Sequence, residues 1–181
     1  MIILGIDPGL ANTGWGIIES RNQKYRALSY DLIKTDTSSD LPIRINIITE
    51  KIESLIDEYK VEAVSIEEIF FLKNVSSAIS VAKVMGAIMN VCVKKNIKVK
   101  TFTPLEVKTV ITGIGRAEKQ QVSDLVKLLL GINEKIKVDH ISDALAIATT
   151  YAIMDTTKSS FRRTLWLMHL KVRLFQLVNK I

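Results

Sequence analysis

The chain has 181 residues, of which 48% are apolar and 24% charged, and its formal net charge is +6. This length and composition exclude a disordered chain and indicate one globular domain with a substantial core. The single cysteine excludes an internal disulfide, and Met1 leads directly into an apolar strand, so we expect a cytoplasmic protein without a secretory leader. No apolar run approaches the ~20 residues that span a bilayer, and we expect no membrane partner.

Apolar patterning and turn residues predict the elements in chain order. The first 35 residues contain three strands with short connections, which favours an antiparallel meander. A helix over residues 40–60, with Asp40 as its N-cap, precedes a buried strand over residues 61–68. The remaining predicted elements are a helix over 74–96, a strand over 97–103, and helices over 103–112, 117–130 and 139–152. This order predicts an α/β fold with a mixed five-stranded sheet flanked by helices.

Two parts of unequal character make up the chain. We expect residues 1–155 to form one compact domain, because they contain neither a low-complexity linker nor an internal repeat. Residues 156–181 form a basic, apolar tail with helical periodicity. Packing of this tail on the domain or on a second subunit is the commoner arrangement, and binding to a membrane or to nucleic acid is the rarer one.

The charge is unevenly distributed. Residues 1–72 carry 7 basic and 12 acidic residues, whereas residues 73–127 carry 10 basic and 3 acidic ones. An acidic segment beside a basic one suits a nuclease, because a polyanionic substrate must be attracted and then cut. A solvated helix end and strand edge explain the lysines between residues 94 and 100 equally well.

Three acidic residues lie in segments that are predicted to be buried or closely packed, where a charged side chain is unfavourable. Asp7 and Glu67 each end a short apolar run that is typical of a buried strand, and Asp143 lies in a predicted helix of small residues. Such a carboxylate is unfavourable unless a cation meets it. His140 and Asp139 precede Asp143 by three and four residues, so all three can share one helical face. The pattern indicates a divalent metal site, which is more typical of an enzyme than of a scaffold.

Parts of this pattern have other interpretations. The Asp7-Pro8-Gly9 turn would also suit the phosphate loop of an actin-like ATPase or a plain hairpin. An ATPase of that fold needs a second phosphate loop, and the sequence contains one such turn. Glu67 and Glu68 point to opposite faces of a strand, so one of them can join Asp7. Glu67 follows the apolar segment directly and is the better candidate.

Four motifs occur in a fixed order along the chain: GIDPGxxxTGWG, SIEExFFxKN, GIGxAEKxQV and HxxDALAIA. In this order and spacing, residues 2–153 resemble the RuvC-type Holliday-junction resolvases of bacteria. The resemblance implies an RNase H-like fold, a homodimer, and cutting of four-way DNA junctions that leaves 5′-phosphate ends. It also implies Mg²⁺ as the cofactor, with Mn²⁺ as a substitute and two ions per site, and a branch-migration motor as a partner.

The resemblance assigns roles residue by residue. Asp7, Glu67, His140 and Asp143 match the catalytic, metal-binding positions. Many members of the family have Asp where this chain has His140, which leaves open whether His140 binds metal or transfers protons. Asp139, one residue earlier, is an alternative ligand.

DNA contacts are implied for a second set of residues. The family position matched by Phe70 stacks on a base near the crossover, although Phe70 and Phe71 are equally consistent with core aromatics. Lys108 and Lys119 resemble basic DNA-contacting positions, and the loop before Lys119 would present helix N-terminal amides to phosphate. The full set of predicted DNA-binding residues is Phe70, Phe71, Lys73, Lys108 and Lys119.

The function predicted from these motifs is paired, symmetric nicking of Holliday junctions in recombination and repair. Two-fold symmetry of a dimer would match that of the junction. The predicted helix containing Ala82, Gly86 and Ala87 is the element expected near the dimer interface. A protein that binds junctions without cutting them is the alternative, and an actin-like ATPase relative is a more remote one.

Overall fold

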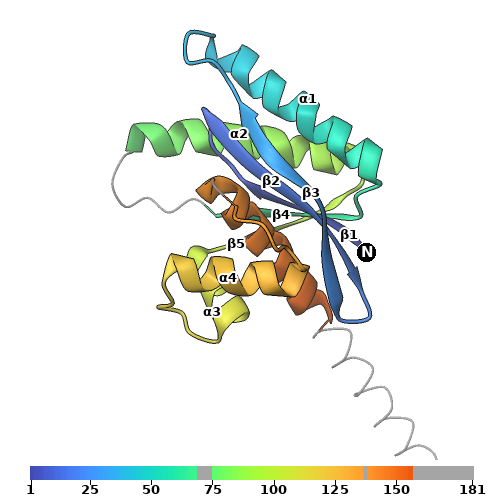
Figure 1. Ribbon diagram of the computed structural model, residues 1–181. Helices are drawn as coiled ribbons and strands as arrows, with labels where there is room; N and C mark the ends of the chain where they lie inside the picture. Colours follow the sequence, from blue (N-terminus) through green and yellow to red (C-terminus); the bar gives the residue numbers. More distant parts are fainter. Residues whose placement is uncertain (69–74, 137, 157–181) are drawn as a thin grey trace, which may run out of the picture.

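A mixed five-stranded sheet forms the centre of the molecule in the computed structural model, which describes residues 1–68, 75–136 and 138–156 (Figure 1). The central strand β1 (Ile2–Asp7) pairs antiparallel with β2 (Asn12–Arg21) and parallel with β4 (Ala63–Glu67). The outer strands β3 (Lys24–Lys34) and β5 (Lys98–Phe102) complete the order β3-β2-β1-β4-β5. The predicted mixed sheet with an antiparallel meander is confirmed.

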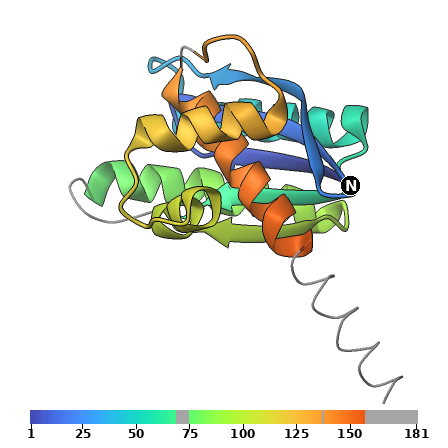
Figure 2. The ribbon, with the colours of Figure 1, turned by 60° about the horizontal axis from the view of Figure 1, so that its bottom comes forward.

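Helices cover both faces of this sheet (Figures 1 and 2). Helices α1 (Leu41–Tyr59) and α2 (Val75–Lys94) pack on one face. Helices α3 (Pro104–Thr112) and α4 (Lys119–Leu130), together with a helix over residues 139–156, pack on the other. No helix in these described ranges is long and apolar enough to cross a membrane. The predicted tail lies outside the described residues from position 157 onward.

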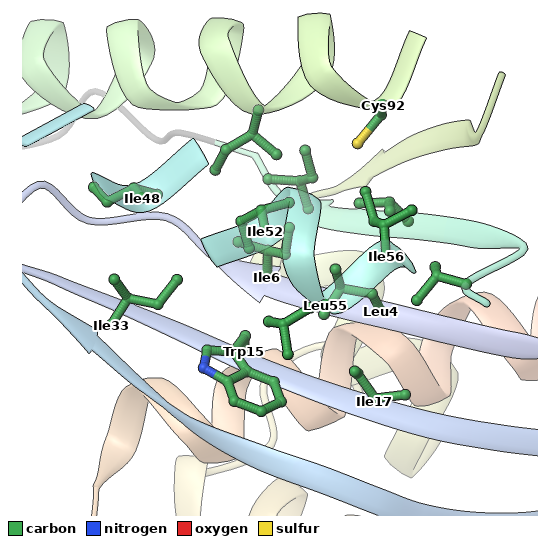
Figure 3. Close-up of a cluster of buried hydrophobic side chains, with 14 of the residues drawn as sticks. Leu4, Ile6, Trp15, Ile17, Ile33, Ile48, Ile52, Leu55, Ile56 and Cys92 are labelled. Atoms are coloured by element: carbon green, nitrogen blue, oxygen red, sulfur yellow. The ribbon is translucent and has the colours of Figure 1, made fainter. Parts of the chain in front are cut away.

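The face under α1 and α2 is filled by branched aliphatic side chains (Figure 3). Leu4 and Ile6 of β1 are fully buried against Ile48 and Ile52 of α1. Burying each such side chain contributes roughly 1.5–3 kcal/mol. Cys92 of α2 lies in the same core, and burial raises the pKa of its thiol to about 11.

Local signals explain where the helices begin. Thr103 caps α3: its hydroxyl accepts from the Glu106 amide, and the Glu106 carboxylate accepts from the Thr103 amide. Asp40 occupies the N-cap position of α1, as predicted, but its side chain makes no capping hydrogen bond. Pro42 in the first turn fixes a helical φ there and contributes to this start.

The helix over residues 139–156 lies unusually close to the sheet. A Cβ atom on Gly5 of β1 would stand 2.0 Å from the Ala144 carbonyl oxygen and 2.8 Å from the Ala148 Cβ atom. A Cβ atom on Gly14 of β2 would stand 2.1 Å from the His140 carbonyl oxygen. Glycine in a strand is typical of such close backbone approach. The contact brings the first turns of this helix to the carboxyl end of β1.

Candidate active site

Strand register places Asp7 and Glu67 side by side. β1 and β4 are parallel neighbours, and Ile6 pairs with Ile66, so the next residue along each strand reaches the same edge of the sheet. Asp7 is 8% exposed and Glu67 is half-buried, whereas Glu68 is exposed. The alternation that favoured Glu67 over Glu68 is therefore observed, with one carboxylate turned inward and the next turned outward.

Glu67 is electrostatically strained at this position. Burial, followed by the charge of Asp7 and a hydrogen bond with it, raises the pKa of Glu67 to about 8. The charge of Asp143 raises it further, while Lys119 opposes the shift. Carboxylates that crowd one another in this way need a proton or a cation between them. The chemistry at this edge of the sheet therefore calls for positive charge.

His140 contacts Asp7 directly. Its Nδ1 atom lies 2.6 Å from Oδ2 of Asp7, and its side chain remains 45% exposed. Residue 140 stands in the first turn of the 139–156 helix, where Gly14 permits the approach. When Nδ1 carries the hydrogen and donates a hydrogen bond to Asp7, the lone pair of Nε2 can accept one.

Asp143 and Asp139 share one lysine. The Lys119 ammonium lies 2.9 Å from Oδ2 of Asp143 and 3.3 Å from Oδ2 of Asp139. Burial raises the pKa of Asp143, and Lys119 acts in the opposite direction. The three polar residues at the start of the helix thus divide between two partners, because His140 meets Asp7 while both aspartates meet Lys119.

A pocket opens beside these groups. It has a volume of about 180 Å³ and is lined by Glu67, Asp143, Lys108 and Lys119, with an apolar wall from residues of α3, α4 and the 139–156 helix. The two lysines predicted to contact DNA therefore border the acidic residues. Phe70, Phe71 and Lys73 lie outside the described residues.

The donor set suits a hard divalent cation, since Mg²⁺ and Mn²⁺ prefer carboxylate oxygens. In the described part of the chain, no group of three or more His, Cys, Asp or Glu side chains is arranged to hold a metal ion as it stands. The contacts above give a physical reason: Lys119 holds Asp143, and His140 holds Asp7. The residue types fit a metal, and their side chains would have to change partners to bind one.

The strand order, together with acidic residues at the ends of the two central parallel strands, defines an RNase H-like protein with a nuclease-type site. The profile of the family described as crossover junction endodeoxyribonuclease RuvC matches residues 3–151, and the chain belongs to this family. It is therefore a hydrolase that resolves Holliday junctions, and the predicted RNase H-like fold is confirmed.

Curated relatives and solved structures agree. The RuvC endonuclease of Caldicellulosiruptor saccharolyticus is 40% identical over 158 residues, which span 87% of this chain and 95% of the relative. The Thermus thermophilus RuvC structure superimposes with a TM-score of 0.82 at 30% identity, covering 87% of this chain and 97% of that one. A T. thermophilus RuvC in complex with a Holliday junction substrate gives a TM-score of 0.80 at 28% identity, covering 87% and 96%.

Some of the site was missed from the sequence. The small residues of the predicted helix after Asp143 allowed a close approach, but Gly5 and Gly14, which meet that helix at Ala144 and at His140, were not recognised. Glycines inside an otherwise apolar strand are a usable signal of such contact. The pairing of Lys119 with both aspartates had no sequence signal, because the residues are 20 and 24 positions apart on different helices.

We expect the metal-free protein to lose stability as the pH rises from about 4.5 to about 8. Folded Glu67 retains its proton up to about pH 8, whereas the unfolded chain releases it near 4.5, so deprotonation favours unfolding within this window. Urea unfolding in EDTA at several pH values measures the slope. Glu67→Gln should flatten it, and Glu50→Gln on the exposed side of α1 should not. An equal slope in wild type and Glu67→Gln would contradict the assignment.

Proposed function

We propose that Asp7, Glu67, His140 and Asp143 form the catalytic, metal-binding centre of this resolvase, with Asp139 as an alternative ligand. The observation that carries the proposal is that Asp7 and Glu67 reach the same edge of the sheet, where burial and the charges of Asp7 and Asp143 raise the pKa of Glu67. Carboxylates from two strands and one helix therefore converge closely enough to repel one another. A divalent cation would relieve that repulsion and keep positions open for water and phosphate.

The contacts of these residues and the family resemblance together suggest a role for each of them. Bound Mg²⁺ or Mn²⁺, two ions per site, would lower the pKa of the attacking water and stabilise the leaving 3′ oxygen. Asp7, Glu67 and Asp143 would supply the oxygen ligands. Because Asp7 already engages Nδ1 of His140, Nε2 is the atom available to accept the proton of the nucleophile. The products would carry 5′-phosphates.

The histidine proposal has a direct test. His140→Asp removes the proton acceptor at Nε2 and supplies a carboxylate instead. If His140 transfers protons, we expect the cleavage rate to change by the same factor in both metals and to lose part of its pH dependence. Single-turnover cleavage in Mg²⁺ and in Mn²⁺ measures both effects. A changed ratio of the two rates would instead indicate that His140 is a metal ligand.

DNA would lie along the basic side of the pocket. Lys108 and Lys119 would contact phosphates that flank the cut bond, and the proposal is supported by their position at the border of the pocket that contains Glu67 and Asp143. The family resemblance adds Phe70, Phe71 and Lys73, with Phe70 stacking on a base at the crossover. The substrate proposed for this surface is a four-way junction, as in the complex of the T. thermophilus relative.

A homodimer would cut both strands of the junction. On the outer side of α2, Ile79 is 49% exposed and Val93 is 68% exposed. The small residues Ala82 and Gly86 lie between them and are also exposed. An apolar face with small residues allows two helices to approach closely around a two-fold axis. We therefore place the dimer interface on α2.

Residues 1–155 would form the nuclease domain. The protein would be located in the cytoplasm, with a branch-migration motor as its partner.

The decisive experiment compares a mobile four-way junction with a linear duplex of the same sequence. We expect paired, symmetric nicks in the junction when Mg²⁺ or Mn²⁺ is present and no cutting of the duplex. Ligation of the products tests for 5′-phosphates, and sedimentation measures the dimer. Junction binding without cleavage in either metal would favour the non-catalytic alternative and reject the proposed centre.

A further inference from the structure

Lys119 occupies a distinctive place in the pocket. It is the first residue of α4, which packs on the 139–156 helix (Figure 2). Its ammonium bridges Asp139 and Asp143 of that helix. Its side chain is 54% exposed, and Asp139 is 81% exposed. An exposed lysine pair of this kind is weak and exchanges readily with solvent. Lys119 is thus a partly exposed positive charge in contact with an acidic site.

The lysine and a metal ion would compete for the same carboxylate. Oδ2 of Asp143 accepts from Lys119 at 2.9 Å, which is full hydrogen-bonding distance. A divalent ion bound there would stand within a few Å of the ammonium, and two cations at that distance repel each other. Because the lysine side chain is intrinsically flexible and 54% exposed, it can turn to solvent when the metal takes its place.

We infer that Lys119 is the internal counter-cation of the acidic site, that a divalent ion displaces it, and that the released ammonium then binds DNA phosphate. The inference rests on the proposed metal centre and adds a coupling to it. Metal binding would increase the affinity for DNA in two ways. It would neutralise the carboxylates that repel phosphate, and it would also free a lysine at the edge of the pocket. By linkage, bound DNA would increase the affinity for metal by the same factor.

Metal affinity in the absence of DNA tests the competition. Mn²⁺ binding followed by electron paramagnetic resonance gives a readout that does not depend on cleavage. Lys119→Met removes the competing charge, so we expect Mn²⁺ to bind about tenfold more tightly than to wild type, the scale of one unit charge a few Å from a divalent ion in a hydrated site. Lys119→Arg keeps the charge and should stay within about threefold of wild type.

Lys127→Met is the matched control. Lys127 is on the same helix and pairs with Asp124 at 3.5 Å, away from the pocket, so its loss should leave Mn²⁺ binding within about twofold of wild type. Circular dichroism of each variant verifies folding. Mn²⁺ affinity that is unchanged or weaker in Lys119→Met overturns the inference.

Two further arms separate the inference from the function on which it rests. Asp7→Asn should weaken Mn²⁺ binding, and unchanged binding in that variant would reject the metal centre itself. Junction affinity is then compared with Ca²⁺ and with EDTA, since Ca²⁺ takes the same oxygen ligands. The gain from Ca²⁺ should be at least about threefold smaller in Lys119→Met than in wild type. An equal gain would overturn the coupling to DNA.

Discussion

Asp7→Asn is expected to abolish junction cleavage while junction binding persists. Asp7 is nearly buried at the end of β1, within reach of both His140 and Glu67. The amide keeps the shape of the side chain but removes the negative charge that would hold a metal and orient His140. We expect the single-turnover rate to fall by about 10³-fold or more, equivalent to at least about 4 kcal/mol of transition-state stabilisation.

Binding should respond differently. Asp7 repels phosphate, so the neutral variant should bind a four-way junction as tightly as wild type or somewhat more tightly. Gel-shift titration in EDTA measures this. Asp57→Asn is the control, since the exposed Asp57 of α1 forms an ion pair with Lys95, which follows α2. Loss of this pair should change neither rate nor affinity by more than about twofold. Cleavage by Asp7→Asn at a rate close to wild type would remove Asp7 from the catalytic centre.

The sheet and its helices could be predicted because their signals are local. Period-two and helical patterns located the elements within a few residues, and turn residues before β2 and β3 identified the antiparallel meander. The predicted strand over 61–68 is observed as Ala63–Glu67, and the predicted helix over 139–152 extends to residue 156. The ends of elements are harder to predict than their types because capping depends on tertiary contacts. Asp40 is an example: it occupies the N-cap position of α1, but its side chain makes no capping hydrogen bond.

The acidic site residues could be predicted because a buried carboxylate at a strand end is unfavourable unless a cation or a hydrogen-bond donor compensates for its burial. The residues that each of them contacts could not be predicted from the sequence. Whether His140 or Asp143 faces Asp7 depends on how far the helix slides along the sheet, and this is set by the contacts of Gly5 and Gly14. The position of Lys119 depends likewise on how α4 crosses the 139–156 helix. Sequence spacing within a helix identifies shared faces, but contacts between elements depend on packing.

Gly5→Ala should be among the most damaging conservative changes in the chain. The new Cβ atom would lie 2.0 Å from the Ala144 carbonyl oxygen, and both atoms belong to or adjoin backbone, so no side chain can move aside. The 139–156 helix would have to shift outward, losing packing in the core beneath it. We expect a loss of about 3 kcal/mol or more in the free energy of unfolding, the upper range for overpacking a core.

Such a shift should impair catalysis even in the molecules that remain folded, because His140 and Asp143 are carried on the same helix and would be drawn away from Asp7. For a chain of this size, 3 kcal/mol corresponds to a fall of about 6–12 °C in melting temperature, which thermal circular dichroism resolves. Ser54→Ala is the matched control: the Ser54 side chain is exposed on α1, and alanine favours a helix, so the melting temperature should hold or rise. Equal melting temperatures for Gly5→Ala and wild type would mean that the helix can move away from an added Cβ atom, which would otherwise lie 2.0 Å from the Ala144 carbonyl oxygen, without loss of stability. The close approach of helix and sheet would then not explain the positions of His140 and Asp143.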